Sequence, residues 1–166
     1  YLGKVPLRAE LPELAEEIEQ APMSPQRAYS ECFGDLKENG VYTYLGCGRN
    51  TTPVHFDAHE NLLLCLYGKK RLLLYPPSDA RFLYPVNDFT RSAVVPFTRH
   101  GELPEDLAET FRLMEDTQPL EVELSAGEML YIPTCWWHCV EGSQDRNMIL
   151  NWWFAMHPSK LAARTV

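Results

Sequence analysis

The sequence places a histidine and an aspartate two positions apart, His55 and Asp57, and another histidine far downstream, His138. In an extended strand, residues i and i+2 point to the same face, so His55 and Asp57 would aim at one point while Phe56 points away. Two imidazoles and one carboxylate are the facial ligand set of non-haem ferrous iron, which leaves coordination positions open for other molecules. We therefore interpret these three residues as metal ligands and as the catalytic centre.

A histidine–x–aspartate pair is common by chance, so its flanks decide how it is interpreted. An apolar run over 62–66 follows it, then a turn at Gly68, a basic triplet over 69–71 and a second apolar run over 72–75 that ends at two prolines. His138 closes the glycine-, proline- and tryptophan-containing segment 127–138. The three residues therefore lie among short strands and turns.

Short β-rich runs recur along the chain, separated by glycine, proline or polar turns, and this pattern predicts an all-β sandwich or barrel. An Asn-Gly pair at 39–40 predicts a hairpin turn. Helices are expected only at the periphery, over 11–18 and over 104–114. The expected strands cover residues 41–46, 53–58, 62–67, 70–75, 120–124, 129–132, 136–140 and 148–154.

Residues 78–118 depart from this strand pattern. They contain several polar breaks and one helical stretch, so we interpret them as an insertion between core strands. Loops of this kind often shape substrate binding, although a simple connector is an equally open interpretation of the individual residues.

At 166 residues, with 45% apolar and 23% charged residues, the chain has the size and composition of one globular domain. No apolar run approaches the roughly 20 residues that a membrane-spanning helix needs, so no membrane partner is expected. The chain opens on Tyr1 rather than methionine, and its first residues already resemble part of a fold. We expect a single domain over 1–166, truncated at its N-terminus.

The five cysteines include no Cys-x-x-Cys pair, which argues against a disulfide framework. A reducing compartment is expected, hence an intracellular protein of the cytoplasm or nucleus. Cys135 and Cys139 lie close enough to His138 to raise a zinc alternative. Closed zinc sites usually have two pairs of close ligands, however, and the second pair is missing.

The net charge of −8 disfavours non-specific nucleic-acid binding, which requires a positive field over the phosphates. The exception is Lys69-Lys70-Arg71, where Lys70 lies between apolar strands. A buried ammonium requires a compensating anion, although a lysine on a surface hairpin is the simpler alternative. Asn151 is polar within the apolar last strand and also requires a partner, from the backbone or from a ligand.

Together these motifs resemble the JmjC branch of the cupin-like oxygenases. The resemblance covers roughly residues 41–77 and 120–157 and is weak across 78–118. It implies an all-β fold with a few peripheral helices, built on a double-stranded β-helix, or jelly-roll, core. The motifs are Thr52-Pro53-x-His55-x-Asp57, Asn61-Leu62, Gly68-Lys69-Lys70-Arg71 with Pro76-Pro77, Gly127-Glu128-x-Leu130-Tyr131-Ile132-Pro133, Trp136-Trp137-His138 and Asn151-Trp152-Trp153.

The resemblance implies Fe(II) as the metal, 2-oxoglutarate as co-substrate and O2 as oxidant, with oxidative decarboxylation coupled to hydroxylation. His55, Asp57 and His138 match the iron ligands of the family. Five further side chains match groups that contact the co-substrate in the family: Thr52, Asn61, Lys70, Asn151 and Tyr1. Tyr44 is an alternative to Tyr1 for the same role.

The intact ligand set favours an active dioxygenase over a protein that keeps only the fold. Asp57 as the carboxylate ligand and the short basic and proline segments resemble the small hydroxylase subgroup, which includes asparaginyl hydroxylases and a hydroxylase of the modified tRNA base wybutosine. We expect hydroxylation of a protein side chain, so a protein or peptide is a more probable partner than tRNA. The alternatives are a tRNA-base hydroxylase, a lysyl demethylase of histones or other proteins, and a non-catalytic binding domain. A homodimer is also possible.

Overall fold

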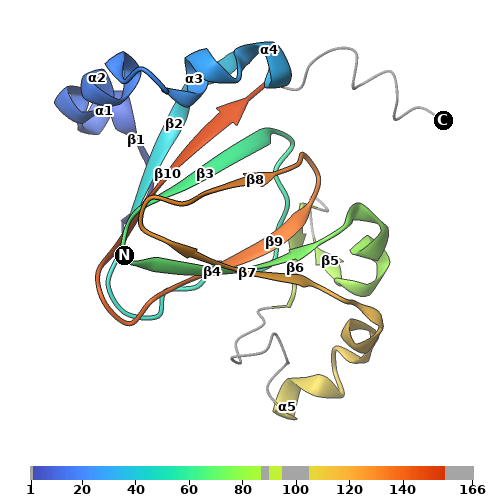
Figure 1. Ribbon diagram of the computed structural model, residues 1–166. Helices are drawn as coiled ribbons and strands as arrows, with labels where there is room; N and C mark the ends of the chain where they lie inside the picture. The colour runs from blue at the N-terminus through green and yellow to red at the C-terminus, as the bar shows by residue number, and fades with distance from the viewer. Residues whose placement is uncertain (1, 87–89, 95–104, 156–166) are drawn as a thin grey trace.

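Two facing β-sheets form the core of the computed structural model, which describes residues 2–86, 90–94 and 105–155 (Figure 1). The larger sheet has the strand order β1-β2-β10-β3-β8 and the smaller one β7-β4-β9. This arrangement confirms the expected all-β jelly-roll core. The larger sheet contains β1 (Leu2–Pro6), β2 (Leu36–Gly46), β3 (Glu60–Tyr67), β8 (Met129–Ile132) and β10 (Asn147–Phe154). The smaller sheet contains β4 (Lys69–Tyr75), β7 (Leu120–Ser125) and β9 (Trp137–Gly142).

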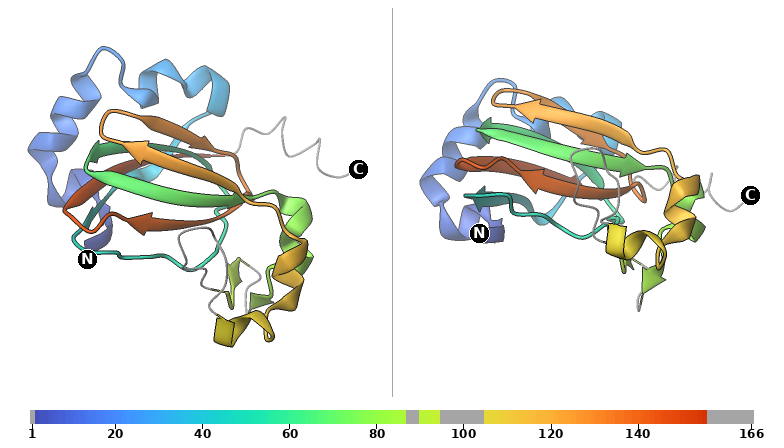
Figure 2. Two further views of the ribbon diagram at one scale, coloured as in Figure 1. Left: turned by 60° about the horizontal axis from the view of Figure 1, so that its bottom comes forward. Right: turned by 90° about the horizontal axis from the view of Figure 1, so that it is seen from below.

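Helical segments cover the outer face of the larger sheet, and a second group lies at one end of the smaller sheet, as the two further views show (Figure 2). The first group precedes β2, and the second lies between β4 and β7, within the segment expected to be an insertion. The first group is α1 (Leu7–Glu10), α2 (Pro12–Gln20), α3 (Pro25–Ala28) and α4 (Ser30–Phe33). The second contains the 3-10 helices η1 (Pro77–Phe82) and η2 (Arg112–Asp116), the short strands β5 (Pro85–Val86) and β6 (Arg91–Ser92), and α5 (Glu105–Ala108).

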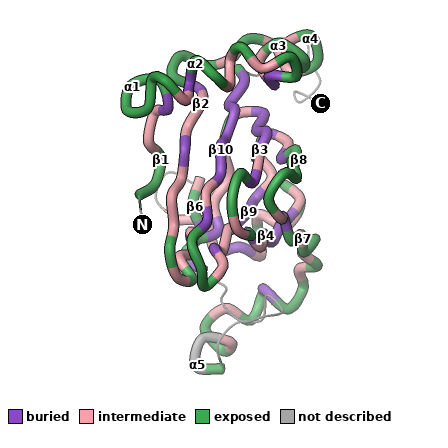
Figure 3. The backbone as a smooth tube through the Cα atoms, turned by 60° about the vertical axis from the view of Figure 1, so that its left-hand side comes forward, coloured by how far each residue is buried: buried purple, intermediate pink, exposed green. Residues whose placement is uncertain are grey.

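The core consists of three apolar layers. One lies between the sheets and includes Leu63, Leu72 and Ile149. A second lies between the larger sheet and the first helices, and a third lies between the smaller sheet and the 77–116 segment. The continuous apolar runs of β3, β4 and β10 follow from this arrangement, since strands buried on both faces need apolar side chains at every position. Figure 3 shows β10 buried over most of its length.

Strand alternation determines which polar residues face the interior between the sheets. On β10, Leu150 and Trp152 pack under the helices, so the intervening Asn151 faces the smaller sheet. On β4, Leu72 and Leu74 pack between the sheets, and Lys70 shares their face. Lys70 and Asn151 are 3% and 5% exposed, so the alternation places two polar side chains inside the barrel.

Three local expectations were wrong. Residues 53–58 form no strand, and His55 instead makes isolated single-residue bridges to two neighbouring segments. The Asn39-Gly40 pair does not form a hairpin but lies within β2, where Asn39 has a φ of 52° and the pairing with β10 shifts register. The expected helix over 104–114 is split into α5 and η2.

All five cysteines are free, so none forms a disulfide. No helix in the described part of the chain is both long and apolar enough to cross a bilayer.

Candidate metal centre

The backbones of His55 and His138 form a reciprocal pair of hydrogen bonds. The N–H of His55 donates to the carbonyl of His138 at 3.0 Å, and the N–H of His138 donates back at 2.7 Å. Residues directly opposite each other in an antiparallel pair project their side chains to the same face. The two imidazoles are accordingly neighbours, with ring centroids 4.4 Å apart.

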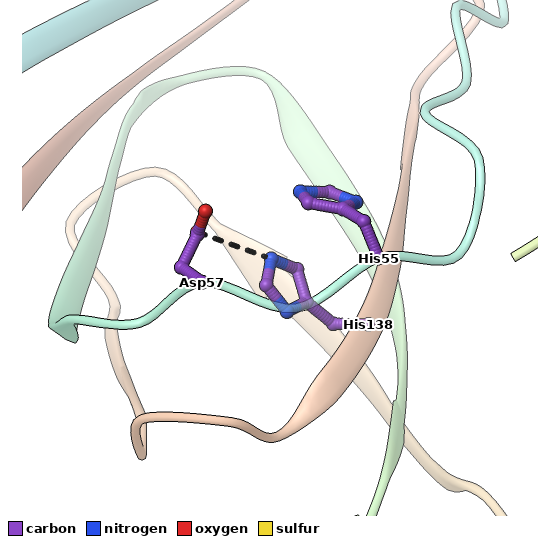
Figure 4. A group of neighbouring side chains, drawn as sticks. All are labelled: His55, Asp57 and His138. Carbon is purple, nitrogen blue, oxygen red and sulfur yellow. Dashed lines mark ion pairs between the residues drawn. The ribbon is translucent and has the colours of Figure 1, made fainter. Parts of the chain in front are cut away.

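Asp57 joins this pair two positions along the same extended segment. Its carbonyl accepts a hydrogen bond of 2.9 Å from the N–H of Cys135, in the turn that precedes β9. Its Oδ2 lies 3.8 Å from Nε2 of His138. The ligand atoms of all three residues lie within 4.8 Å of one another, and Figure 4 shows the side chains around one common space. The i, i+2 spacing therefore directs His55 and Asp57 to one point even though their extended segment is not a regular strand.

Both imidazoles have a fixed tautomer. Nδ1 of His55 lies 2.8 Å from the carbonyl of Pro53, and Nδ1 of His138 lies 3.0 Å from the carbonyl of Trp136. A carbonyl oxygen can only accept, so each Nδ1 carries a proton and Nε2 is the ring nitrogen that can bind a metal. A second hydrogen bond of this kind orients most metal-binding histidines in proteins.

Burial also keeps His138 in its metal-binding form. Removal of the ring from water lowers the pKa of His138 well below its ordinary value, and the neighbouring His55 lowers it further. The negative charge of Asp57 acts in the opposite direction but is the smaller effect. The ring is therefore neutral at neutral pH, as a metal ligand must be.

The donor set fits a divalent transition-metal ion. Two neutral nitrogens and one carboxylate oxygen suit ferrous iron and provide no sulfur ligand. Cys139 faces the opposite side of the smaller sheet, where it packs with Leu73 and Trp137. Within residues 2–86, 90–94 and 105–155, this triad is the only group of three His, Cys, Asp or Glu side chains near enough to share an ion.

A cavity of about 220 Å³ extends from the triad between the two sheets. All the co-substrate residues expected on described positions contribute to its wall: Thr52, Asn61, Lys70 and Asn151. Tyr44, the rival of Tyr1, lines it as well, whereas Tyr1 lies outside the described residues. The volume is below the usual range for a drug-sized ligand, about 300–1,000 Å³, and suits a small molecule.

Lys70 is the cation at the inner part of this cavity. Burial lowers the pKa of Lys70 to about 8, and the nearby Cys65 thiol partly offsets that effect. The amine is still mainly protonated at neutral pH, so the cavity contains a positive charge as well as the triad. A buried ammonium is a strong recognition element for a carboxylate.

The other expected contact residues are held by hydrogen bonds within the fold. Nδ2 of Asn151 donates to Oδ1 of Asn61 at 2.9 Å, across the neighbouring strands β10 and β3. The hydroxyl oxygen of Thr52 accepts from the N–H of Val140 at 2.9 Å. These contacts fix the polar wall of the cavity before any ligand arrives.

A family description of a cupin-like domain matches residues 1–160. The chain belongs to the cupin-like domain family. Its relatives place this cupin-like domain in the JmjC branch, as the motifs predicted.

Three relatives of this cupin-like domain illustrate the range of proteins that share it. Human HSPB1-associated protein 1 is 34% identical over 134 residues, which cover 78% of this chain and 27% of that protein. The human bifunctional peptidase and (3S)-lysyl hydroxylase JMJD7 is 31% identical over 168 residues, 90% of this chain and 51% of that protein. The lysine-specific demethylase JMJ30 of Arabidopsis thaliana is 30% identical over 156 residues, covering 92% and 33%. The chain thus spans only about a quarter to a half of the length of these relatives.

Sequence reasoning assigned no role to several residues near the site. Lys4 of β1 and Arg91 of β6 line the cavity without belonging to a motif, and Trp153 of β10 lines it although it was only part of the Asn151-Trp152-Trp153 motif. Glu60 is 2% exposed, and its Oε2 accepts hydrogen bonds from the Tyr131 hydroxyl and from the Thr134 N–H, just before the turn that leads to His138. Only its position three residues after Asp57 could have indicated this role.

Proposed function

We propose that this domain is an Fe(II)- and 2-oxoglutarate-dependent oxygenase that hydroxylates a protein side chain. The observation that supports it is a metal-binding triad and a buried lysine on the wall of one small cavity. Together the two features match the two ends of a dicarboxylate, because a lysine ammonium binds a carboxylate and the triad suits a metal ion that a second carboxylate can ligate.

The strand register gives the spacing between the two features. Leu74 of β4 pairs with His138 on β9, and Lys70 lies four residues before Leu74 on the same face of β4. Four residues of strand span about 13 Å, of which the lysine side chain itself covers a large part. The remaining space suits a short dicarboxylate with one end at the ammonium and the other at the triad.

When bound, ferrous iron together with 2-oxoglutarate supplies the oxygen chemistry, in which one oxygen atom enters a C–H bond while the co-substrate becomes succinate and CO2. His55, Asp57 and His138 would hold the ion at the cavity. Lys70 orients the distal carboxylate by a charge-assisted hydrogen bond. Leu63, Val140 and Ile149 complete the wall with apolar groups that restrict water near the reacting atoms.

The printed activities of two relatives, a lysyl hydroxylase and a lysine-specific demethylase, support a protein substrate. The net charge of −8 weighs against the tRNA alternative. Five free cysteines agree with an intracellular location in the cytoplasm or nucleus. The possible homodimer stays a prediction.

The decisive experiment measures succinate formed from 2-oxoglutarate by the protein with Fe(II), O2 and ascorbate. We expect turnover by the wild type and by Asp116→Ala, an exposed aspartate of η2, and none by Asp57→Ala or His55→Ala. Wild-type protein that binds Fe(II) but forms no succinate with or without peptides would contradict the proposal. Mass spectrometry of peptides then separates hydroxylation, which adds one oxygen, from demethylation, which removes a methyl group.

A further inference from the structure

Two cations at the cavity, Lys4 and Arg91, have no part in the proposed metal and co-substrate sites. Both line the cavity, in addition to Lys70. We call this pair the cationic rim. Neither residue forms an ion pair with an acidic side chain in the described parts of the chain. Their charges are therefore available to a molecule that reaches the cavity.

The fold fixes Arg91 directly beside the metal ligands. Strand β6 runs antiparallel to the segment that contains His55, because the N–H of Phe56 donates to the carbonyl of Thr90 at 3.0 Å and the N–H of Ser92 donates to the carbonyl of Val54 at 2.8 Å. Arg91 is bridged directly to His55, and His55 is bridged to His138 on its other side. Residues opposite each other in an antiparallel pair project to the same face, so Arg91 lies next to His55 and on the same face as the two imidazoles.

Lys4 reaches the cavity from β1. Its backbone lies in the left-handed region, with a φ of 56°, at a register shift between Leu2 and Val5 in the pairing with β2. Its Nζ lies 4.9 Å from the centroid of the Trp153 ring and 6.0 Å from that of Tyr42. Aromatic faces attract an ammonium at such distances, so the two rings hold the charge at the cavity wall.

The balance of charge at the site indicates what the rim would bind. With the iron and 2-oxoglutarate bound, the two positive charges of the ion and the charge of Lys70 balance the dicarboxylate and Asp57. The rim then leaves two positive charges uncompensated, on a protein whose net charge is −8. Three cations elsewhere on the smaller sheet and its turns are paired with glutamates: Lys69 with Glu123, Arg71 with Glu121 and Arg49 with Glu141. The rim is therefore a local positive surface around the reaction centre.

We infer that the substrate is an acidic segment of a protein, whose carboxylates pair with Lys4 and Arg91 while the residue between them enters the cavity. The inference rests on the proposed function and names the substrate class for that site. Complementary charge selects partners and raises association rates, even when each exposed pair contributes little affinity. A nucleic acid fits less well, because its binding usually requires many phosphate contacts and the chain carries a net charge of −8.

Peptide binding tests the rim without turnover. Two peptide sets of equal length are randomised at the centre and flanked by Asp and Glu in one and by Lys and Arg in the other. Fluorescence anisotropy is measured without O2, with Fe(II) and 2-oxoglutarate present. We expect the acidic set to bind at least about tenfold more tightly, and the Lys4→Glu, Arg91→Glu double variant to lose this preference. Arg27→Glu, a change at an exposed cation of α3 away from the cavity, should retain it.

Each other outcome overturns the inference. Equal binding of both sets, a preference for the basic set, or an unchanged preference in the double variant would show that the rim does not select acidic segments. Tighter binding of a single-stranded RNA than of acidic peptides, with steep salt dependence, would assign the rim to nucleic acid. Because binding is measured without catalysis, failure of the succinate assay affects only the proposed function.

Discussion

Each histidine of the triad donates Nδ1–H to the carbonyl of the residue two positions before it. His55 uses Pro53, and His138 uses Trp136. The contact closes a small local ring, so the tautomer depends on the conformation of each segment rather than on a distant carboxylate. The two ligands are thereby oriented in the same way, although they come from segments far apart in the sequence.

Lys70 can be tested by a change that keeps its shape and removes its charge. Lys70→Met should weaken 2-oxoglutarate binding by about 30-fold or more, because a buried carboxylate loses its charged partner. Iron affinity should change little, since the triad is intact. Calorimetric titration of each ligand measures both effects, with Lys69→Met, an exposed neighbour that pairs with Glu123, as the control. Equal co-substrate affinity in Lys70→Met and wild type would remove Lys70 from the site.

The lowered pKa of Lys70, about 8, predicts a pH dependence of co-substrate binding. Below this pKa the free protein already carries the ammonium, so affinity should be nearly constant. Above it the free protein must take up a proton to bind the dianion, so the dissociation constant should rise about tenfold between about pH 8.5 and pH 9.5. Titrations across this range measure the slope, and Lys70→Met should be flat. A flat wild-type profile would contradict the assignment.

At the scale of elements, two turns between strands depend on a glycine with a positive φ. Gly68, between β3 and β4, has a φ of 73°, and a Cβ there would lie 2.4 Å from the carbonyl oxygen of Arg146 in the turn before β10. This close approach holds the turn from β3 to β4, just before Lys70, against the turn that leads into β10, the strand of Asn151. Gly127, between β7 and β8, has a φ of 90° but open space around it.

These two glycines form a matched pair. Gly127→Ala should lower the free energy of unfolding by about 1–2 kcal/mol, the cost of a left-handed alanine. Gly68→Ala should lower it by about 1–3 kcal/mol more, because the new methyl group also overlaps the Arg146 carbonyl. Urea denaturation measures both. Equal decreases in the free energy of unfolding for the two variants would show that the close approach to Arg146 does not contribute to the cost of Gly68→Ala.

At the scale of the whole molecule, the site joins parts that do not neighbour one another in sequence. His55 and Asp57 come from the segment that connects β2 and β3 of the larger sheet, and His138 comes from β9 of the smaller sheet. An ion held by all three links these parts only in the folded state. Metal binding is therefore coupled to folding.

Fe(II) without O2 should raise the melting temperature of the wild type by about 5 °C or more once the metal reaches about a hundred times its dissociation constant. Asp57→Ala should show little or no increase, because it loses the only anionic ligand of the triad. Differential scanning calorimetry measures the shift, with Asp116→Ala expected to behave as the wild type. An equal increase in Asp57→Ala would place the metal elsewhere.

The sequence by itself determined the short apolar runs between turns, the His55–Asp57 spacing and the lysine between apolar strands. These are local properties, and they predicted an all-β sandwich or barrel and one point of convergence for His55 and Asp57. The jelly-roll core and the co-substrate role of Lys70 were predicted from the resemblance to the JmjC branch. Only the tertiary structure decided that residues 53–58 are not a strand, since His55 is paired through single bridges to separate segments. It also brought Tyr44, Lys4 and Arg91 to the cavity wall. Pairing between distant segments sets these positions, and no local pattern records which segments will pair.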